Sequence, residues 1–106
     1  MQKIYKMYIN GEWVESESKE YIDIIDPSTS NKISSVPNAT TKDADYAIDV
    51  ARDAFDKGTW PTLPPSERSK ILLKVADLIE LKLKEYAISE TMISGKSIKQ
   101  STNYDI

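Results

Sequence analysis

Carboxylates are the side chains of this sequence that could do chemistry, because its 106 residues include no cysteine and no histidine. The chain therefore has no thiol nucleophile and no disulfide, and it lacks the commonest acid–base group and metal ligand at neutral pH. Asp23 and Asp26 lie three apart on an extended segment, so they point to opposite faces. Asp43, Asp45 and Asp49 lie at a predicted helix start, where capping and solvation explain them better than a cation, which needs more converging oxygen ligands.

Phosphate binding and serine chemistry lack their usual signatures as well. Gly11, Gly58 and Gly95 are the three glycines, and none lies in a Gly-rich phosphate loop. Serines are plentiful, but no histidine is present to activate one, and no Ser–Lys arrangement stands out. We therefore predict no catalytic, no cofactor-binding and no metal-binding residue in this sequence.

The charge balance limits the classes of partner. The chain has 14 basic and 17 acidic residues, a net charge of −3, which gives it no general attraction to nucleic acid or anionic membranes. Trp13, Trp60 and the tyrosines are then expected to pack in a core or interface rather than to stack on single strands. No apolar run follows the charged start at residues 1–6, so this start does not resemble a signal peptide. No stretch has the length of a membrane span. The sequence predicts one small cytoplasmic domain with no nucleic-acid or membrane partner.

The clearest local element is a hairpin over residues 5–15. Asn10-Gly11 favours a two-residue type I′ turn, because both central positions of that turn need a positive φ. The turn fixes the cross-strand pairs, and one face then carries an aromatic pair beside a charge pair. The predicted pairs are Ile9 with Glu12, Tyr8 with Trp13, Met7 with Val14, and Lys6 with Glu15.

A second hairpin is expected over residues 21–36. Residues 21–26 resemble a short strand that Pro27 stops, residues 27–31 form a turn by composition, and residues 32–36 can return as a strand before Pro37. A polar loop at residues 16–20 separates the two hairpins. Residues 1–39 are therefore predicted to form the β part of the chain.

Two helical regions follow the hairpins. The first is predicted over residues 40–58, with Thr40 or Thr41 as the N-cap and Lys57-Gly58 as the stop. The second is predicted over residues 65–95, because Pro65 is a good first helical residue. Residues 97–106 carry no clear stop signal. The fold class is therefore α+β, with two N-terminal hairpins and then two or three helices.

The second helical region carries more apolar surface than one face of a helix needs. One stripe consists of Leu72, Val75, Ile79, Leu83 and Tyr86, and a second consists of Ile71, Leu78, Leu81 and Ile88. A helix with this pattern is normally covered on two sides. The residues alone thus describe an α+β unit with excess apolar surface and no site.

Five segments, in order, resemble the N-terminal part of the NAD(P)-dependent aldehyde dehydrogenase superfamily. No single segment is specific, but their order over about residues 8–96 indicates kinship. The segments are 8–14, which resemble the opening hairpin; 26–29, which resemble the NPxTG turn; 44–55, which resemble the first helix; 60 with 65–80, which resemble the connection and second helix; and 90–96, which resemble the ETLDxGK segment.

This resemblance implies a fold context and an activity for the intact family. The corresponding stretch is the outer part of a Rossmann-like α/β cofactor domain, packed around a central sheet that later residues supply. The intact enzymes oxidise an aldehyde to a carboxylate by thiol attack and hydride transfer to NAD or NADP. Their nucleophilic Cys, general-base Glu, oxyanion-stabilising Asn and cofactor loops come later and have no counterpart in residues 1–106.

The resemblance also implies a cation site in some members. Backbone carbonyls near the NPxTG turn and the Asp of ETLDxGK bind a monovalent cation there. The matching carbonyls belong to Ile24 and Ile25, but Ile93 stands at the Asp position and Ser30 at the usual glycine of the turn. Since the charged ligand is lost, we predict no metal site here.

Two hypotheses follow for the function. In the first, the chain is the N-terminal piece of an aldehyde dehydrogenase, from a truncated gene, a split gene or an expressed piece, and it is inactive and binds no cofactor alone. In the second, it is a stand-alone interaction module that self-associates or docks on a full-length relative. That interface would use Leu78, Leu81, Ile88 and the Tyr8–Trp13 face, because exposed apolar patches usually mark interfaces.

Overall fold

The computed structural model describes residues 3–106, which form two compact units. The first unit comprises residues up to 24 and residues 32–62, and the second comprises residues 25–31 and 63–106. The first unit contains nearly all of the strand residues and the first helix, whereas the later helices group with residues 25–31. Met1 and Gln2, part of the charged start at residues 1–6, lie outside the described residues.

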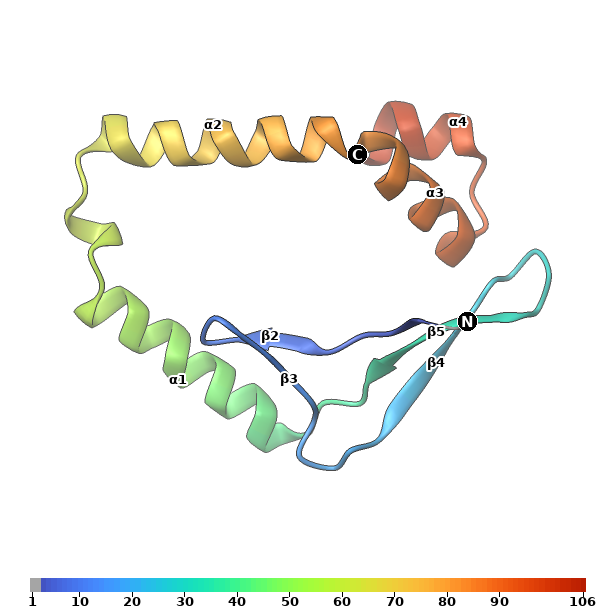
Figure 1. Ribbon diagram of the computed structural model, residues 1–106, viewed down its shortest axis with the longest axis horizontal. Coiled ribbons are helices and arrows are strands. Elements are labelled where there is room, and N and C mark those ends of the chain that lie inside the picture. The colour runs from blue at the N-terminus through green and yellow to red at the C-terminus, as the bar shows by residue number, and fades with distance from the viewer. Residues whose placement is uncertain (1–2) are drawn as a thin grey trace. The chain divides into compact units, whose positions relative to one another are not determined.

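A three-stranded sheet lies in the N-terminal half (Figure 1). Its central strand is β5 (Lys32–Pro37), flanked by β1 (Lys3–Ile4) and β4 (Tyr21–Ile25). β4 and β5 form the expected second hairpin, with the Asp26 N–H donating to the Asn31 carbonyl at the turn and the Asn38 N–H to the Glu20 carbonyl at the other end, both at 2.9 Å. β1 pairs in parallel with β5, a pairing that the sequence pattern does not predict.

The first hairpin has the predicted register. β2 (Met7–Ile9) and β3 (Glu12–Val14) pair Met7 with Val14, Tyr8 with Trp13 and Ile9 with Glu12. Asn10 and Gly11 have φ values of 55° and 79°, both positive as a type I′ turn requires. The Tyr8 and Trp13 ring centroids lie 4.9 Å apart, and the ion pair beyond them joins Lys6 Nζ to Glu15 Oε1 at 3.9 Å.

The first helix, α1 (Thr41–Lys57), begins with a capping box and ends at Gly58. Thr40 is the N-cap: its hydroxyl accepts from the Asp43 N–H, while the Asp43 carboxylate accepts from the Thr40 N–H. Each side chain satisfies a backbone donor that the first helical turn leaves unpaired. This confirms the predicted start of the helix and chooses between the two threonines.

The second helical region is divided. After a short 3₁₀ turn, η1 (Trp60–Thr62), come α2 (Pro65–Leu81) and α3 (Leu83–Ser94), with a break at Lys82, whose φ and ψ are −105° and 9°. α4 (Ile98–Gln100) and the π-helical turn η2 (Ser101–Asp105) follow, in the segment without a sequence signal. No helix in residues 3–106 is both long and apolar enough to cross a membrane.

Apolar side chains are covered sparsely. Among the described residues, Ala87 is the one buried hydrophobic residue, whereas Leu81 is 81% exposed and the other stripe residues of α2 are between 43% and 60% exposed. The excess apolar surface expected from the sequence is thus present in the structure.

Candidate functional site

The Asp43 carboxylate, in the first turn of α1, accepts hydrogen bonds from three other residues. Oδ2 accepts from the Thr40 N–H at 2.8 Å and from the Ser16 hydroxyl at 2.7 Å, and Oδ1 accepts from the Glu17 N–H at 3.1 Å. The Ser16 side chain is buried, and its Oγ also lies 2.8 Å from the Asn38 carbonyl. We call these four residues and Asn38 the Asp43 node.

Hydrogen bonding to the charged form fixes the ionisation of this carboxylate. The Ser16 hydroxyl is the largest cause, followed by the Thr40 N–H, and together with the Glu17 N–H they hold the pKa of Asp43 at about 2. A group ionised at neutral pH and surrounded by its own donors has no proton to give and little affinity for one. The Asp43 node therefore ties the loop after β3 to the start of α1 rather than doing acid–base chemistry.

Asp23 and Asp26, the two aspartates of the extended segment, take separate partners. Asp23 Oδ1 lies 2.6 Å from Lys32 Nζ and accepts from the Ser35 hydroxyl at 3.1 Å, and the bond to Lys32 lowers the pKa of Asp23 most. Asp26 accepts from the Ser28 hydroxyl at 2.7 Å and from the Ser28 N–H at 2.8 Å, which lowers its pKa also. Neither pair of partners resembles a catalytic constellation.

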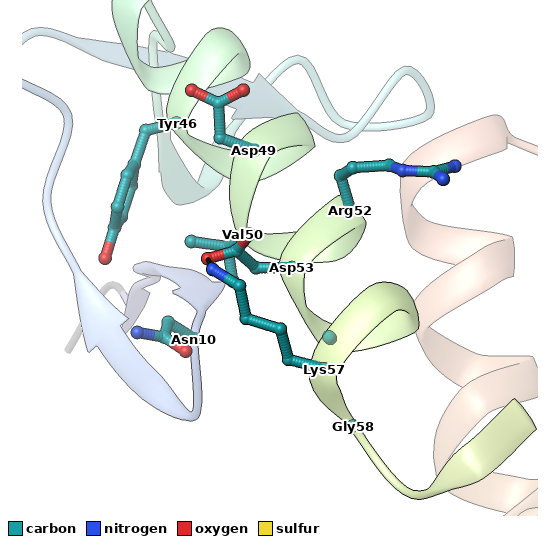
Figure 2. A pocket seen from close by; sticks show the side chains of 9 residues that line it. Asn10, Tyr46, Asp49, Val50, Arg52, Asp53, Lys57 and Gly58 are labelled. Carbon is teal, nitrogen blue, oxygen red and sulfur yellow. Dashed lines mark hydrogen bonds and ion pairs between the residues drawn. The ribbon is translucent and has the colours of Figure 1, made fainter. Parts of the chain in front are cut away.

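A hollow of about 740 Å³ lies between the hairpin turn and α1 (Figure 2). Asn10 faces it from the turn, and Tyr46, Asp49, Asp53 and Lys57 face it from α1. Lys57 Nζ lies 2.8 Å from Asp53 Oδ2, so this cation already has a carboxylate partner. The hollow brings together no nucleophile with a base, and within residues 3–106 no three acidic, histidine or cysteine side chains are grouped to hold a metal ion.

Two of the family-like segments meet inside the second unit. Gly95, which ends α3 in the left-handed region at φ 76°, lies against the Pro27 ring: a Cβ added at Gly95 would stand 3.0 Å from Pro27 Cγ. Ser30, at the position where the family turn usually has glycine, has φ 59°, the conformation that glycine adopts most readily. The turn and the end of α3 are thus built around two left-handed residues.

At the position of the charged cation ligand in the ETLDxGK-like segment, this chain has the hydrocarbon side chain of Ile93. Ile93 lies in the last turn of α3 with 52% of its surface exposed, and its side chain has no oxygen to offer. The residue that sequence reasoning missed is Ser16, whose position in a polar loop gives no signal of its burial.

The chain also matches a family model, in addition to the element order, the Pro27–Gly95 contact and the capped first helix described above. The model described as the aldehyde dehydrogenase family matches residues 13–106, which is nearly the whole chain. The chain belongs to the aldehyde dehydrogenase family.

Individual relatives agree with this assignment. Aldehyde dehydrogenase 1 of Tanacetum cinerariifolium is 45% identical over 94 residues, which are 89% of this chain and 19% of that protein. The crystal structure of an NAD-dependent aldehyde dehydrogenase from Sinorhizobium meliloti is similar with a TM-score of 0.91 at 35% identity, covering 96% of this chain and 20% of the other. A betaine aldehyde dehydrogenase from Staphylococcus aureus, solved in complex with NAD+, has a TM-score of 0.89 at 38% identity, covering 92% of this chain and 19% of the other. The chain spans about a fifth of the length of these relatives.

Proposed function

We propose that this chain supplies the first part of the Rossmann-like cofactor domain of an NAD(P)-dependent aldehyde dehydrogenase. The assembled enzyme would oxidise an aldehyde to a carboxylate. Support comes from the family match over residues 13–106 and from the similarity to solved relatives, one an NAD-dependent enzyme and another in complex with NAD+. Residues 1–39, 40–58 and 65–95 would contribute the hairpins, the first helix and the second helical region of that domain.

The observation that carries this proposal is the apolar surface of α2 and α3. Ile71, Leu72, Leu78 and Leu81 are between 45% and 81% exposed, although a helix with two apolar stripes is normally covered on two sides. The proposed cover is the remainder of the dehydrogenase, with its central sheet. The chain alone is proposed to be inactive and to bind no cofactor, since its 106 residues contain no Cys nucleophile and no Gly-rich cofactor loop.

Complementation tests the proposal directly. The purified chain is mixed with a relative that lacks the matching N-terminal fifth, and aldehyde-dependent reduction of NAD+ and of NADP+ is followed. Activity is expected from the mixture and from neither part alone. Activity of the chain by itself would overturn its proposed inactivity, and a mixture in which the parts neither associate nor react would overturn the role as a component of the domain.

A second candidate function, an interaction module, is favoured by the same exposed residues. Leu78, Leu81 and Ile88 would form one contact surface, and the Tyr8–Trp13 pair, 62% and 67% exposed, a second. In this proposal the chain self-associates or docks on a full-length relative.

Light scattering after size exclusion distinguishes the two candidates. Leu81→Lys should reduce the mass of a self-associated chain while its far-UV circular dichroism is unchanged, and Lys74→Ala, at another exposed position on α2, is the matched control. A monomeric wild-type chain that also fails to bind a full-length relative would rule the module out.

A further inference from the structure

We propose that Asn10 is a site of spontaneous deamidation, and that opening of the β2–β3 hairpin sets the rate. This inference concerns a covalent change in the chain itself and does not depend on the proposed function. It rests on the side chain at the turn, on the residue that follows it, and on how weakly the hairpin is held.

Asn10 meets the chemical requirements for the reaction. It is exposed, and the next residue is Gly11, which has no side chain to shield its backbone nitrogen. Even a Cβ added at Gly11 would find no atom within 4 Å, so the space around this peptide group is open. Among the described residues, none makes a hydrogen bond to the Asn10 side-chain amide, whereas the Asn38 amide donates to Glu20 Oε2 at 3.4 Å.

The reaction needs only water. The Gly11 backbone nitrogen, losing its proton, attacks Cγ of Asn10 and forms the fifth bond of a succinimide ring, while the side-chain nitrogen takes up a proton and leaves as ammonia. Water then opens the ring at one of its two carbonyls. Cleavage on one side gives aspartate, and cleavage on the other gives isoaspartate, in which the main chain runs through the former side chain. No oxidation or reduction takes place.

The folded turn restrains this attack and local opening permits it. With φ values of 55° and 79°, Asn10 and Gly11 are held by the adjoining Ile9–Glu12 pair. The two strands have only three residues each, their aromatic pair is more than 60% exposed, and a two-stranded hairpin of this kind is marginal in water. Segments with so little burial open with small free energies, and the opened turn can bring Cγ to the nitrogen.

The two products have different consequences for the hairpin. Aspartate keeps the turn, since Asp-Gly also favours type I′, and it adds a negative charge to the hollow that Asp49 and Asp53 already face. Isoaspartate adds a main-chain methylene to a two-residue turn, so the strands can no longer keep the Tyr8–Trp13 register. Formation of aspartate would thus make the hollow between the hairpin and α1 more acidic, whereas formation of isoaspartate would displace the hairpin that forms one side of it.

Peptide mapping by mass spectrometry tests the proposal on the full chain. During incubation at mildly alkaline pH, the peptide with Asn10 should show the exchange of an amide NH₂ for OH, and it should do so faster than the peptides with Asn31, Asn38 and Asn103. Equal rates of deamidation at all four asparagines would overturn the proposal that Asn10 is the reactive site.

A matched pair of tryptophan variants tests the role of opening. Trp13→Ala removes the cross-strand partner of Tyr8 and should accelerate the change at Asn10 by roughly threefold or more. Trp60 lies outside the hairpin, so Trp60→Ala should leave the rate of deamidation at Asn10 unchanged. If Trp13→Ala has no effect, or if both variants accelerate the reaction alike, hairpin opening does not set the rate.

Discussion

The two units of the chain differ in where their stabilising partners come from. In the first unit, Ser16 and Asp43 are 27 residues apart and meet in one hydrogen-bonded node, so distant segments of the unit hold each other. In the second unit, the described contacts are mostly local to α3, α4 and η2, while α2 presents apolar side chains to solvent. The first unit joins distant segments through hydrogen bonds, whereas the second unit leaves the apolar stripe residues of α2 between 43% and 81% exposed.

Gly95→Ala should produce the largest loss of stability, and it tests whether the second unit depends on the contact between Gly95 and the Pro27 ring. The left-handed φ of 76° disfavours a side chain, and the new Cβ would stand 3.0 Å from Pro27 Cγ. We expect a loss of about 2 kcal/mol in the free energy of unfolding, measured by urea unfolding with far-UV circular dichroism. Lys99→Ala is the exposed control, and an equal effect of both changes would contradict the importance of this contact.

Thr40→Ala should have a smaller effect, confined to the first unit. It removes the hydroxyl that accepts from the Asp43 N–H, and loss of such an N-cap costs about 1 kcal/mol. Trp13 and Trp60 both lie in the first unit, so tryptophan fluorescence during urea unfolding reports on it. Far-UV circular dichroism reports on the helices of both units. If its urea midpoint shifts as much as that of the fluorescence, the two units are coupled, which would contradict the comparison.

Ser30→Gly should stabilise the second unit slightly. Ser30 has φ 59° in the turn that packs near Gly95, and glycine reaches this conformation without a steric penalty. We expect a gain of only about 0.5 kcal/mol, because relief of the left-handed steric penalty is partly offset by the greater freedom of glycine in the unfolded chain. The urea midpoint by circular dichroism measures it; a loss would show that the serine side chain contributes a contact of its own.

Acid should weaken the first unit, with almost no effect near neutrality. Because the folded pKa of Asp43 is about 2, below its ordinary 3.8, the node contributes its full stability above pH 3.8 and loses it as pH falls toward 2. Tryptophan fluorescence during urea unfolding at several pH values checks this. Asp43→Asn should flatten the dependence but not abolish it, since the pKa of Asp23 is lowered too.

Elements with local chemical signals were predictable from the sequence. Asn10-Gly11 fixed the hairpin register, and the threonines before Asp43 located the start of α1, because a turn type or a cap depends on residues close in the chain. Pro65 marked the start of α2 for the same reason. Family kinship was recognisable because five such local segments occur in the family's order.

Features that depend on distant residues were not predictable. β1 has two residues, too few for an alternating pattern, and its partner β5 lies about thirty residues later. The break at Lys82 has neither glycine nor proline to announce it. The burial of Ser16 and the division into two units follow from which segments meet in space, and composition does not record that.

The membership of residues 25–31 in the second unit has a consequence for synthesis. The first unit is complete once residue 62 has left the ribosome, so it can fold while the rest is still being made. The turn with Pro27 and Ser30 emerges before most of that unit, yet Gly95, against which Pro27 packs, is translated only after α3. The turn at residues 25–31 therefore cannot make its contact with Gly95 until the end of α3 has been translated, whether or not Ser30 already has its left-handed φ.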